Sequence, residues 1–375
     1  MKKLLFVVNA PEFFLSHRLA IALAARKAGF EVHVATGSGK SIAHIIALGF
    51  IHHKIPVTRS GQNPVRELIT VVHLYRLFRS HRPDIVHLIT IKPVLYGGIA
   101  ARLAKVTAVV SAVSGLGTVF LDEAGSAGLR RRMVSSLYRL AFSHRRIAVI
   151  FQNPDDKKTL ISAGALKPEQ SRMIRGSGVN LADYPVVAEP DGKPVVVMAA
   201  RLLRDKGVFE FVEAARILKT KHVEVIMRLI GAPDPENTSS VTERDLENWR
   251  EEPLLELFGY RTDIAQQYAN SNIVCLPSYR EGLPKGLVEA AACGRAVVTT
   301  DVPGCRDAIE PDVTGLLVPV KDASALADAI QDLVERPERR ACMGSAGRQL
   351  AEEVFGIEQV VERHMSIYRE LLADE

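Results

Sequence analysis

The stretch IVCLPSYREGLPKGLVEAAACGRAVVTTDVPG, residues Ile273–Gly304, contains one complete strand–loop–helix–strand unit. Its first apolar run predicts a strand over Ile273–Leu276. The small-residue segment Lys285–Cys293 predicts a helix that begins just after Pro284. A second apolar run predicts the next strand over Ala296–Thr299. Short β-branched strands joined by a helix are typical of a parallel sheet that is covered by helices on both faces.

The same alternation runs along the rest of the chain. One helix is expected over Leu15–Ala28, where apolar residues recur at helical spacing. In the first half, strands are expected at Leu4–Val8, Val32–Ala35, Ile51–Val57, Asp84–Leu88, Val109–Ala112 and Ala148–Phe151. In the second half, they are expected at Val195–Ala200, Val223–Ile230, Leu255–Gly259, Ile273–Leu276, Ala296–Thr299 and Gly315–Val318.

The segment Leu181–Pro194 is rich in Pro, Asp and Gly and predicts a linker between two domains. The expected fold class is therefore α/β, with two Rossmann-like, doubly wound parallel-sheet domains over residues 1–182 and 193–355. Residues 356–375 supply a further helix that can pack back on the first domain. Ligands in such sheets bind at the carboxyl ends of the strands, so we expect the site in a cleft where these edges face each other.

Net charge, cysteine spacing and the length of apolar runs indicate which partners and which location to expect. The 375 residues carry a formal net charge of +5, which suits anionic partners such as nucleotides, diphosphates, acidic membranes or nucleic acids. The four cysteines form no CxxC pair and show no zinc-ligand spacing, so we expect reduced thiols and no metal. The short first apolar run reads as a strand rather than a signal peptide, and no stretch is long enough to span a bilayer. These features predict a cytoplasmic protein.

The segment RLLRDKG, Arg201–Gly207, follows a predicted strand and precedes a predicted helix. Backbone N–H groups and the helix dipole favour an anion at such a loop. Arg201 and Lys206 add two cations, which together predict a clamp for a diphosphate. The alternative is an ordinary solvated basic loop.

The segment EGLPKGLVE, Glu281–Glu289, follows the next strand. Its glycines permit close approach of the backbone to a ligand, and the helix that starts after Pro284 again favours an anion. Two carboxylates beside an anion site suit a ligand that also presents hydroxyl groups, as a nucleotide sugar does. The alternative is that Glu281 caps the helix and Glu289 pairs with a surface cation.

The whole of EGLPKGLVEAAACGRAVVTTDVPG resembles the C-terminal signature of family 4 glycosyltransferases, which have the GT-B fold. RLLRDKG resembles the Arg/Lys diphosphate loop of that family. GSGVNLADYP and TGLLVPVKDASALADAI resemble its domain-closing segment and its late strand and helix. In the first half, FFLSHRLAIALA and HLITIKPVLYGGIAAR resemble the subgroup that builds bacterial capsule, O-antigen and related lipid-linked glycans.

The resemblance implies retaining transfer from a nucleotide sugar, with UDP as the expected nucleotide and with no metal or other cofactor. Arg201 and Lys206 would bind the donor diphosphate and stabilise the leaving group. Glu289 would hold the ribose hydroxyls, and Glu281 would hold the donor hexose and complete the catalytic set. The remaining residues implied for the phosphate and sugar site are Gly282, Leu283 and Lys285.

The acceptor implied by the resemblance is a saccharide linked to polyprenyl diphosphate, bound by the first domain. The residues expected to bind it are Ser16, His17, Arg18, Lys92, Ser114 and Gly115. The cations would face the diphosphate, and Gly115 would let the backbone approach a sugar. The alternatives are an ordinary helix start at His17 and Arg18 and a plain loop lysine at Lys92.

The segment Gly128–Arg146 predicts a basic amphipathic helix. Such helices lie on anionic bilayers with the apolar face down. The cations expected to contact the membrane are Arg130, Arg131, Arg132 and Arg139. The protein would then attach peripherally to the inner face of the cytoplasmic membrane. The alternative is a core-packed helix with a solvated basic face.

Three other functions compete with the transferase. A UDP-sugar epimerase or hydrolase of the same fold would need extra acid and base residues, and no clear His or Asp pair supplies them. A dinucleotide oxidoreductase would need GxGxxG after a strand, which neither candidate loop has. A nucleic-acid binder could use the arginine helix, but aromatic residues make up only 6% of the chain and no binding motif accompanies the arginines, so we expect no nucleic-acid partner.

Overall fold

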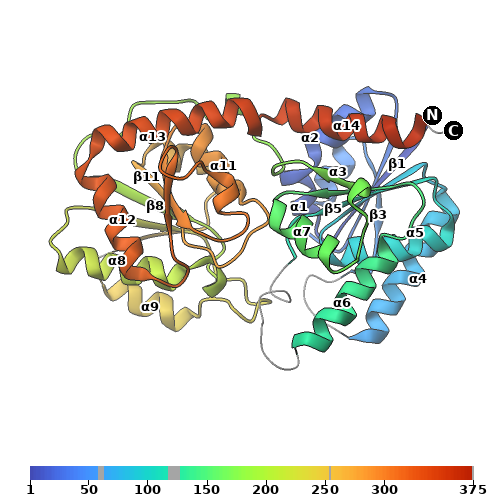
Figure 1. Cartoon of the computed structure of the whole chain (residues 1–375), viewed down its shortest axis with the longest axis horizontal. Helices are drawn as coiled ribbons and strands as arrows, with labels where there is room; N and C mark the ends of the chain where they lie inside the picture. Colours follow the sequence, from blue (N-terminus) through green and yellow to red (C-terminus); the bar gives the residue numbers. More distant parts are fainter. Residues whose placement is uncertain (58–62, 117–126, 253–254, 374–375) are drawn as a thin grey trace. The chain divides into compact units, whose positions relative to one another are not determined.

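The computed structural model describes residues 1–57, 63–116, 127–252 and 255–373, with side chains of α6 described from Arg132 onward. The chain forms two compact units (Figure 1). Unit 1 contains Met1–Ser177 and the C-terminal segment Glu358–Glu375, and unit 2 contains Gly178–Ile357. Each unit has its own sheet and its own buried core.

Unit 1 contains a seven-stranded parallel sheet in the order β3-β2-β1-β4-β5-β6-β7. Its strands are β1 (Lys3–Val8), β2 (Glu31–Thr36), β3 (Ile51–Lys54), β4 (Ile85–Ile89), β5 (Ala108–Val113), β6 (Ile147–Phe151) and β7 (Ser171–Met173). The six predicted strands are present, although β3 ends at Lys54 rather than Val57. The short β7 was missed because three residues with one apolar side chain give no periodic signal.

Helices cover both faces of this sheet. They are α1 (Pro11–His17), α2 (Leu19–Lys27), α3 (Ile42–Ala47), α4 (Pro64–His81), α5 (Gly98–Ala104), α6 (Ala127–Ala141), α7 (Pro154–Ser162) and α14 (Ile357–Ala373). Residues of α4, α5 and α6 share one core with the sheet, while α1, α2, α3 and α14 share the other. Successive strand residues point to opposite faces, so Leu5 and Val7 enter the first core and Leu4 and Phe6 the second.

The prediction of a single helix over Leu15–Ala28 is wrong. The chain forms α1 and then α2, because the backbone of Arg18 leaves the helical region at φ −132° and ψ −8°. The Arg18 N–H still donates to the Phe14 carbonyl at 2.8 Å, so this residue closes α1 before α2 begins.

Unit 2 contains a six-stranded parallel sheet in the order β10-β9-β8-β11-β12-β13. Its strands are β8 (Val195–Ala199), β9 (Ile226–Ile230), β10 (Leu255–Gly259), β11 (Ile273–Leu276), β12 (Ala296–Thr300) and β13 (Gly315–Val318). Its helices are α8 (Val208–Thr220), α9 (Glu243–Glu251), α10 (Ile264–Ala269), α11 (Lys285–Ala292), α12 (Ala323–Glu335) and α13 (Pro337–Leu350). The two parallel sheets confirm the predicted α/β class.

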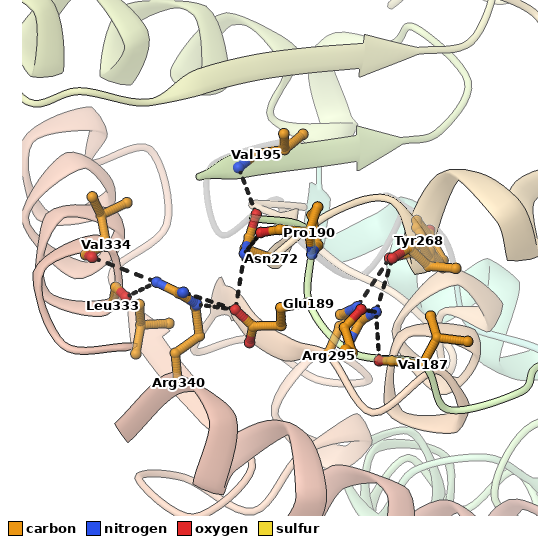
Figure 2. A network of polar contacts seen from close by, with 12 residues as sticks. Val187, Glu189, Pro190, Val195, Tyr268, Asn272, Arg295, Leu333, Val334 and Arg340 are labelled. Carbon is orange, nitrogen blue, oxygen red and sulfur yellow. Dashed lines mark hydrogen bonds and ion pairs between the residues drawn. The ribbon is translucent and has the colours of Figure 1, made fainter. Parts of the chain in front are cut away.

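The boundary between the units lies at Ser177 and Gly178, before the expected end of the first domain at residue 182. The expected linker 181–194 is part of unit 2, and two buried arginines hold it there (Figure 2). Arg295 donates to the Val187 carbonyl at 3.0 Å, and Arg340 forms an ion pair with Glu189 at 2.7 Å. The segment has the irregular backbone of a linker but is fixed by charged hydrogen bonds, which sequence spacing does not reveal.

Candidate active site

The predicted donor residues gather at one edge of the unit 2 sheet. Strands β8 and β11 are parallel neighbours, so the loops that follow them leave the same carboxyl edge. Arg201 and Lys206 lie in the loop after β8, and Glu281 lies in the loop after β11. This edge is where ligands bind in doubly wound sheets.

A glycine brings these two loops together. Gly207 follows a turn of 3₁₀ helix, Arg204–Lys206, and has a positive φ of 76°. A Cβ atom at Gly207 would lie 2.1 Å from the Pro277 carbonyl oxygen, so only glycine fits. The start of α8 can therefore pack directly against the chain that leaves β11.

Lys206 and Glu281 form an ion pair across the two loops. The hydroxyl of Ser278 also donates to Glu281 Oε1, at 2.8 Å. The Lys206 and Glu281 side chains are 22% and 12% exposed, so both are partly withdrawn from water. Two donors thus fix one oxygen of the Glu281 carboxylate. Sequence reasoning missed Ser278, although its place directly after a strand was a usable signal.

Glu289 lies on α11 and is buried. Lys285 pairs with it at 3.2 Å, one helical turn away, and the phenol of Tyr184 donates to the same oxygen at 2.5 Å. Burial, and then the Glu289 carboxylate, raise the pKa of Tyr184 far above its usual range. Tyr184 was quoted in the segment GSGVNLADYP but was not predicted as a site residue, because only the fold brings it to α11.

Arg201 makes a different contact from Lys206. Its guanidinium donates to Asp234 at 2.7 Å, and Asp234 lies in the chain that follows β9. Because β9 is the other neighbour of β8, Arg201 stays at the same edge of the sheet. Its side chain is 48% exposed, so it can reach a ligand while Asp234 orients it.

Gly282 and Leu283 complete the loop before α11, but the Leu283 side chain is buried in the core of unit 2. Only the backbone of Leu283 can therefore line a site. Gly304, after β12, packs against this loop. A Cβ atom on Gly304 would lie 2.4 Å from the Glu281 carbonyl oxygen. The loop is thus held from both sides, by Gly207 and by Gly304.

The predicted acceptor trio of Ser16, His17 and Arg18 does not form one cationic surface. The Ser16 hydroxyl lies 2.7 Å from His17 Nδ1, and the His17 ring stacks on Phe13. The Arg18 side chain instead enters the interior and is 2% exposed. Burial lowers the pKa of the Arg18 guanidinium to about 10. The sequence could not separate these roles because the break between α1 and α2 turns Arg18 inward.

Lys92 lies after β4 and forms an ion pair with Glu67 of α4 at 2.6 Å. Both side chains are mostly shielded from solvent. The neighbouring Tyr96 has its pKa raised to about 12, first by burial and then by Glu67. Lys92 is therefore a positioned cation rather than a plain loop lysine.

Polar atoms are buried at the carboxyl edge of unit 1. In the described part of the chain, Asn9 Oδ1, Thr90 Oγ1 and Ser114 Oγ are buried without a hydrogen-bond partner. They follow β1, β4 and β5, which are consecutive in the sheet. Thr90 also has a positive φ of 72°, which is strained for a β-branched residue. Gly115, beside Ser114, has a φ of 124°. Ser114 and Gly115 are among the residues predicted to bind the acceptor, whereas Asn9 and Thr90 are not.

The basic helix α6 packs on unit 1 and is also exposed. Tyr138 and Phe142 are buried in the core, while Met133 and Leu140 are 60% and 44% exposed. Arg139 donates to the Gly164 carbonyl at 2.9 Å. Arg132 is exposed, and the side chains of Arg130 and Arg131 lie outside the described residues. In the part of the chain that the structure describes, no helix is both long and apolar enough to cross a membrane.

Comparison with known proteins identifies the family. Residues 182–350 match the family Glycosyl transferases group 1, and residues 3–153 match Glycosyl transferase 4-like. The chain is 30% identical over 376 residues to the N,N'-diacetylbacillosaminyl-diphospho-undecaprenol alpha-1,3-N-acetylgalactosaminyltransferase of Campylobacter jejuni, covering 95% of this chain and 97% of that protein. It is 25% identical over 362 residues to the capsular polysaccharide biosynthesis glycosyltransferase CapM of Staphylococcus aureus, covering 93% and 92%.

Two solved structures have the same fold as this chain. The crystal structure of Anabaena HepE in complex with UDP-glucose matches with a TM-score of 0.77 at 20% identity, covering 100% of both chains. The sucrose-phosphate synthase of Thermosynechococcus elongatus matches with a TM-score of 0.81 at 22% identity, again over 100% of both. The chain belongs to the group 1, family 4-like glycosyltransferases, and its two Rossmann-like units make up the GT-B fold.

Proposed function

We propose that the protein transfers a hexose or N-acetylhexosamine from a UDP-sugar to a saccharide linked to polyprenyl diphosphate, with retention of anomeric configuration and without a metal. The product would serve bacterial surface polysaccharide or related glycan synthesis. The Campylobacter jejuni relative is named for a diphospho-undecaprenol acceptor, and the HepE structure was solved with UDP-glucose. These two names supply the chemical classes of acceptor and donor.

The observation that carries the proposal is the pairing of cations with carboxylates at the edge of the unit 2 sheet. Lys206 pairs with Glu281, and Lys285 pairs with Glu289. A diphosphate would accept from the ammonium groups, while the carboxylates would accept from sugar and ribose hydroxyls. Arg201, held by Asp234, would add a bidentate donor. The diphosphate of a nucleotide sugar would thus bind cations, and its sugar and ribose hydroxyls would bind carboxylates.

Electrostatics would supply most of the catalysis. Negative charge grows on the departing diphosphate in the transition state, and preorganised cations stabilise it more than they stabilise the ground state. Lys206 is already oriented by Glu281. Arg201 and Lys206 would therefore stabilise the leaving group, which is the task that a divalent cation performs in other transferases.

The acceptor would bind at the carboxyl edge of unit 1. The buried, unpartnered oxygens of Asn9, Thr90 and Ser114 suit the hydroxyl and amide donors of a sugar. Lys92, held by Glu67, would stand nearby as a cation for the acceptor's diphosphate.

The exposed surfaces of α6 and α4 would contact the membrane. Along α4, Val65, Leu68, Ile69 and Val72 are exposed at helical spacing, and α4 and α6 both contact the π-helical turn Pro93–Gly97. Exposed apolar side chains together with arginines are typical of interfacial helices. We therefore place the protein on the inner face of the cytoplasmic membrane as a peripheral protein.

The test is a transfer assay with UDP-sugars and undecaprenyl diphosphate-linked saccharides. We expect UDP release that depends on the acceptor, unchanged activity in EDTA, and a product whose anomeric proton shows the configuration of the donor. UDP release that proceeds equally without an acceptor would favour the epimerase or hydrolase instead. Loss of activity in EDTA, or an inverted product, would overturn the corresponding part of the proposal.

A further inference from the structure

Three histidines meet on one face of the unit 1 sheet, beside its edge strand β3. His33 lies on β2, His53 on the edge strand β3, and His81 at the end of α4. One ring nitrogen from each lies within 4.8 Å of the other two. His33 Nδ1 is 2.8 Å from His53 Nε2, and the His53 and His81 ring centroids are 4.4 Å apart.

The fold explains why they converge. In the parallel pairing of β2 and β3, Ala35 lies opposite His53 and His33 lies opposite Ile51. Because side chains alternate between faces, His33 and His53 point to the same face of the sheet. His81 is brought to them by α4, which packs over that face. In the sequence the three residues are far apart, so no metal-ligand spacing is visible.

We propose that His33, His53 and His81 together bind one first-row divalent transition-metal ion, with Zn²⁺ as the ion of reference. Neutral imidazole is a preferred ligand for Zn²⁺ and its neighbours in the series, whereas Mg²⁺ and Ca²⁺ prefer oxygen. Zn–N bonds are about 2.0–2.1 Å long, so tetrahedral ligand nitrogens lie roughly 3.4 Å apart. Small rotations of the three rings would meet that spacing.

Glu31 prepares the cluster for a metal. Its carboxylate lies 2.6 Å from His33 Nε2, on the side of the ring away from His53. This contact places the His33 proton on Nε2 and directs the Nδ1 lone pair toward the other histidines. A carboxylate behind a ligating histidine is the usual outer-shell arrangement of metal sites. Lys3 Nζ lies 3.6 Å from the same oxygen of the Glu31 carboxylate.

Two of the three rings, those of His53 and His81, also favour the neutral form that binds metals. Burial, and then the neighbouring His81 and His33 rings, lower the pKa of His53 to about 4. Burial likewise lowers the pKa of His81. On metal binding the proton on His53 Nε2 would move to Nδ1 of the same ring, which frees Nε2 to coordinate the metal, and the fourth position would be open to water.

The place of the cluster indicates a structural role. α4 ends at His81 and the chain then enters β4, so the cluster lies toward the amino ends of the strands. The unpartnered oxygens of Asn9, Thr90 and Ser114 lie at the opposite, carboxyl ends. A metal here would fasten the edge strand β3 to β2 and to the end of α4, and would not take part in transfer.

The test uses the full chain, stripped with EDTA, dialysed and titrated with ZnCl₂ in a calorimeter. We expect one saturable Zn²⁺ per chain, a rise of several degrees in thermal midpoint, and a Co²⁺ spectrum with visible d–d bands from nitrogen ligands. MgCl₂ should produce none of these.

The variants His53→Gln and His81→Gln should each weaken Zn²⁺ binding at least 100-fold and abolish the Co²⁺ bands. His52→Ala is the matched control, because His52 is adjacent on β3 but hydrogen-bonds Thr36 at 2.9 Å. It should bind as the unaltered chain does. Circular dichroism without metal checks that each variant folds. Absence of saturable binding, or equal binding by His53→Gln and the unaltered chain, would overturn the proposal.

Discussion

Lys206 and Glu281 form an ion pair that joins the loop after β8 to the loop after β11. The two residues are 75 positions apart in the sequence. Gly207 permits the contact, because any side chain there would collide with the Pro277 carbonyl. The pair presents a cation and a carboxylate side by side at the edge where the donor is proposed to bind.

Lys206→Ala should lower the rate constant of transfer by roughly 100- to 1000-fold, the loss typical of removing one preorganised electrostatic group. Its effect on KM for the donor should be smaller, because the charge that it stabilises grows in the transition state. Steady-state assays of UDP release measure both constants. Lys221→Ala is the control, since Lys221 also pairs with a carboxylate, Asp328, but between helices on the surface. Equal losses in the two variants would contradict the assignment.

Glu289→Gln should weaken UDP binding. Hydrogen bonds to a charged acceptor contribute about 1.5–3 kcal/mol, so the Kd should rise about 10- to 100-fold. Tyr184→Phe, which removes one donor to Glu289 and keeps the ring, should have a smaller effect. Titration calorimetry with UDP measures both. An unchanged Kd in Glu289→Gln, with the exposed Glu213→Gln as control, would remove Glu289 from the site.

The variant Thr90→Gly tests whether the Thr90 hydroxyl binds the acceptor without adding backbone strain. Glycine tolerates a φ of 72° without strain, so the variant should be no less stable than the unaltered chain. It also loses the buried hydroxyl, so KM for the lipid-linked acceptor should rise about tenfold while the Kd for UDP stays constant. Lys105→Gly is a matched control, because Lys105 ends α5 with a φ of 57°. The prediction is wrong if Thr90→Gly, like the Lys105→Gly control, leaves the KM for the acceptor unchanged.

Met133→Ser combined with Leu140→Ser should weaken binding to vesicles that contain anionic lipid. Burying a large apolar side chain contributes about 1.5–3 kcal/mol, so partitioning should fall at least tenfold. Vesicle flotation at fixed salt measures it. Val313→Ser, at an exposed apolar position in unit 2, should have no effect. Undiminished flotation of the double variant would count against α6 as a membrane surface.

Unit 1 should lose stability as the pH falls below about 6.5. Burial lowers the pKa of His364 to about 3, and burial also lowers the pKa of His87. A histidine kept neutral in the fold contributes stability above its unfolded pKa and loses it as the pH falls toward the folded value. At pH 5 the buried His364 ring costs about 2 kcal/mol of stability relative to pH 7.

His364→Gln should therefore show a smaller fall in thermal midpoint between pH 7 and pH 5 than the unaltered chain does. Calorimetry of the full chain at both pH values provides the comparison. His222→Gln, at an exposed position in unit 2, should keep the full dependence. An identical fall in His364→Gln would show that this ring is not the source.

The elements of the fold were predictable because their signals are local. Apolar β-branched runs marked the six predicted strands of each sheet, and turn residues marked their ends. The short β7 and the break at Arg18 were not predictable. The first lacks an apolar run, and the second is a change of backbone angles at one residue inside an apolar pattern that continues across it.

By itself the sequence determined the two α/β units, and it predicted a diphosphate-binding loop and a pair of site glutamates, because these depend on periodicity and on residues within one loop. Only the tertiary structure decided that Lys206 contacts Glu281, that Tyr184 reaches Glu289, that Arg18 is interior, and that His33, His53 and His81 meet. Each of these is a contact between separate elements. Such contacts are set by strand order, by register and by the close packing that glycines such as Gly207 allow, and none of these is written in the spacing of neighbouring residues.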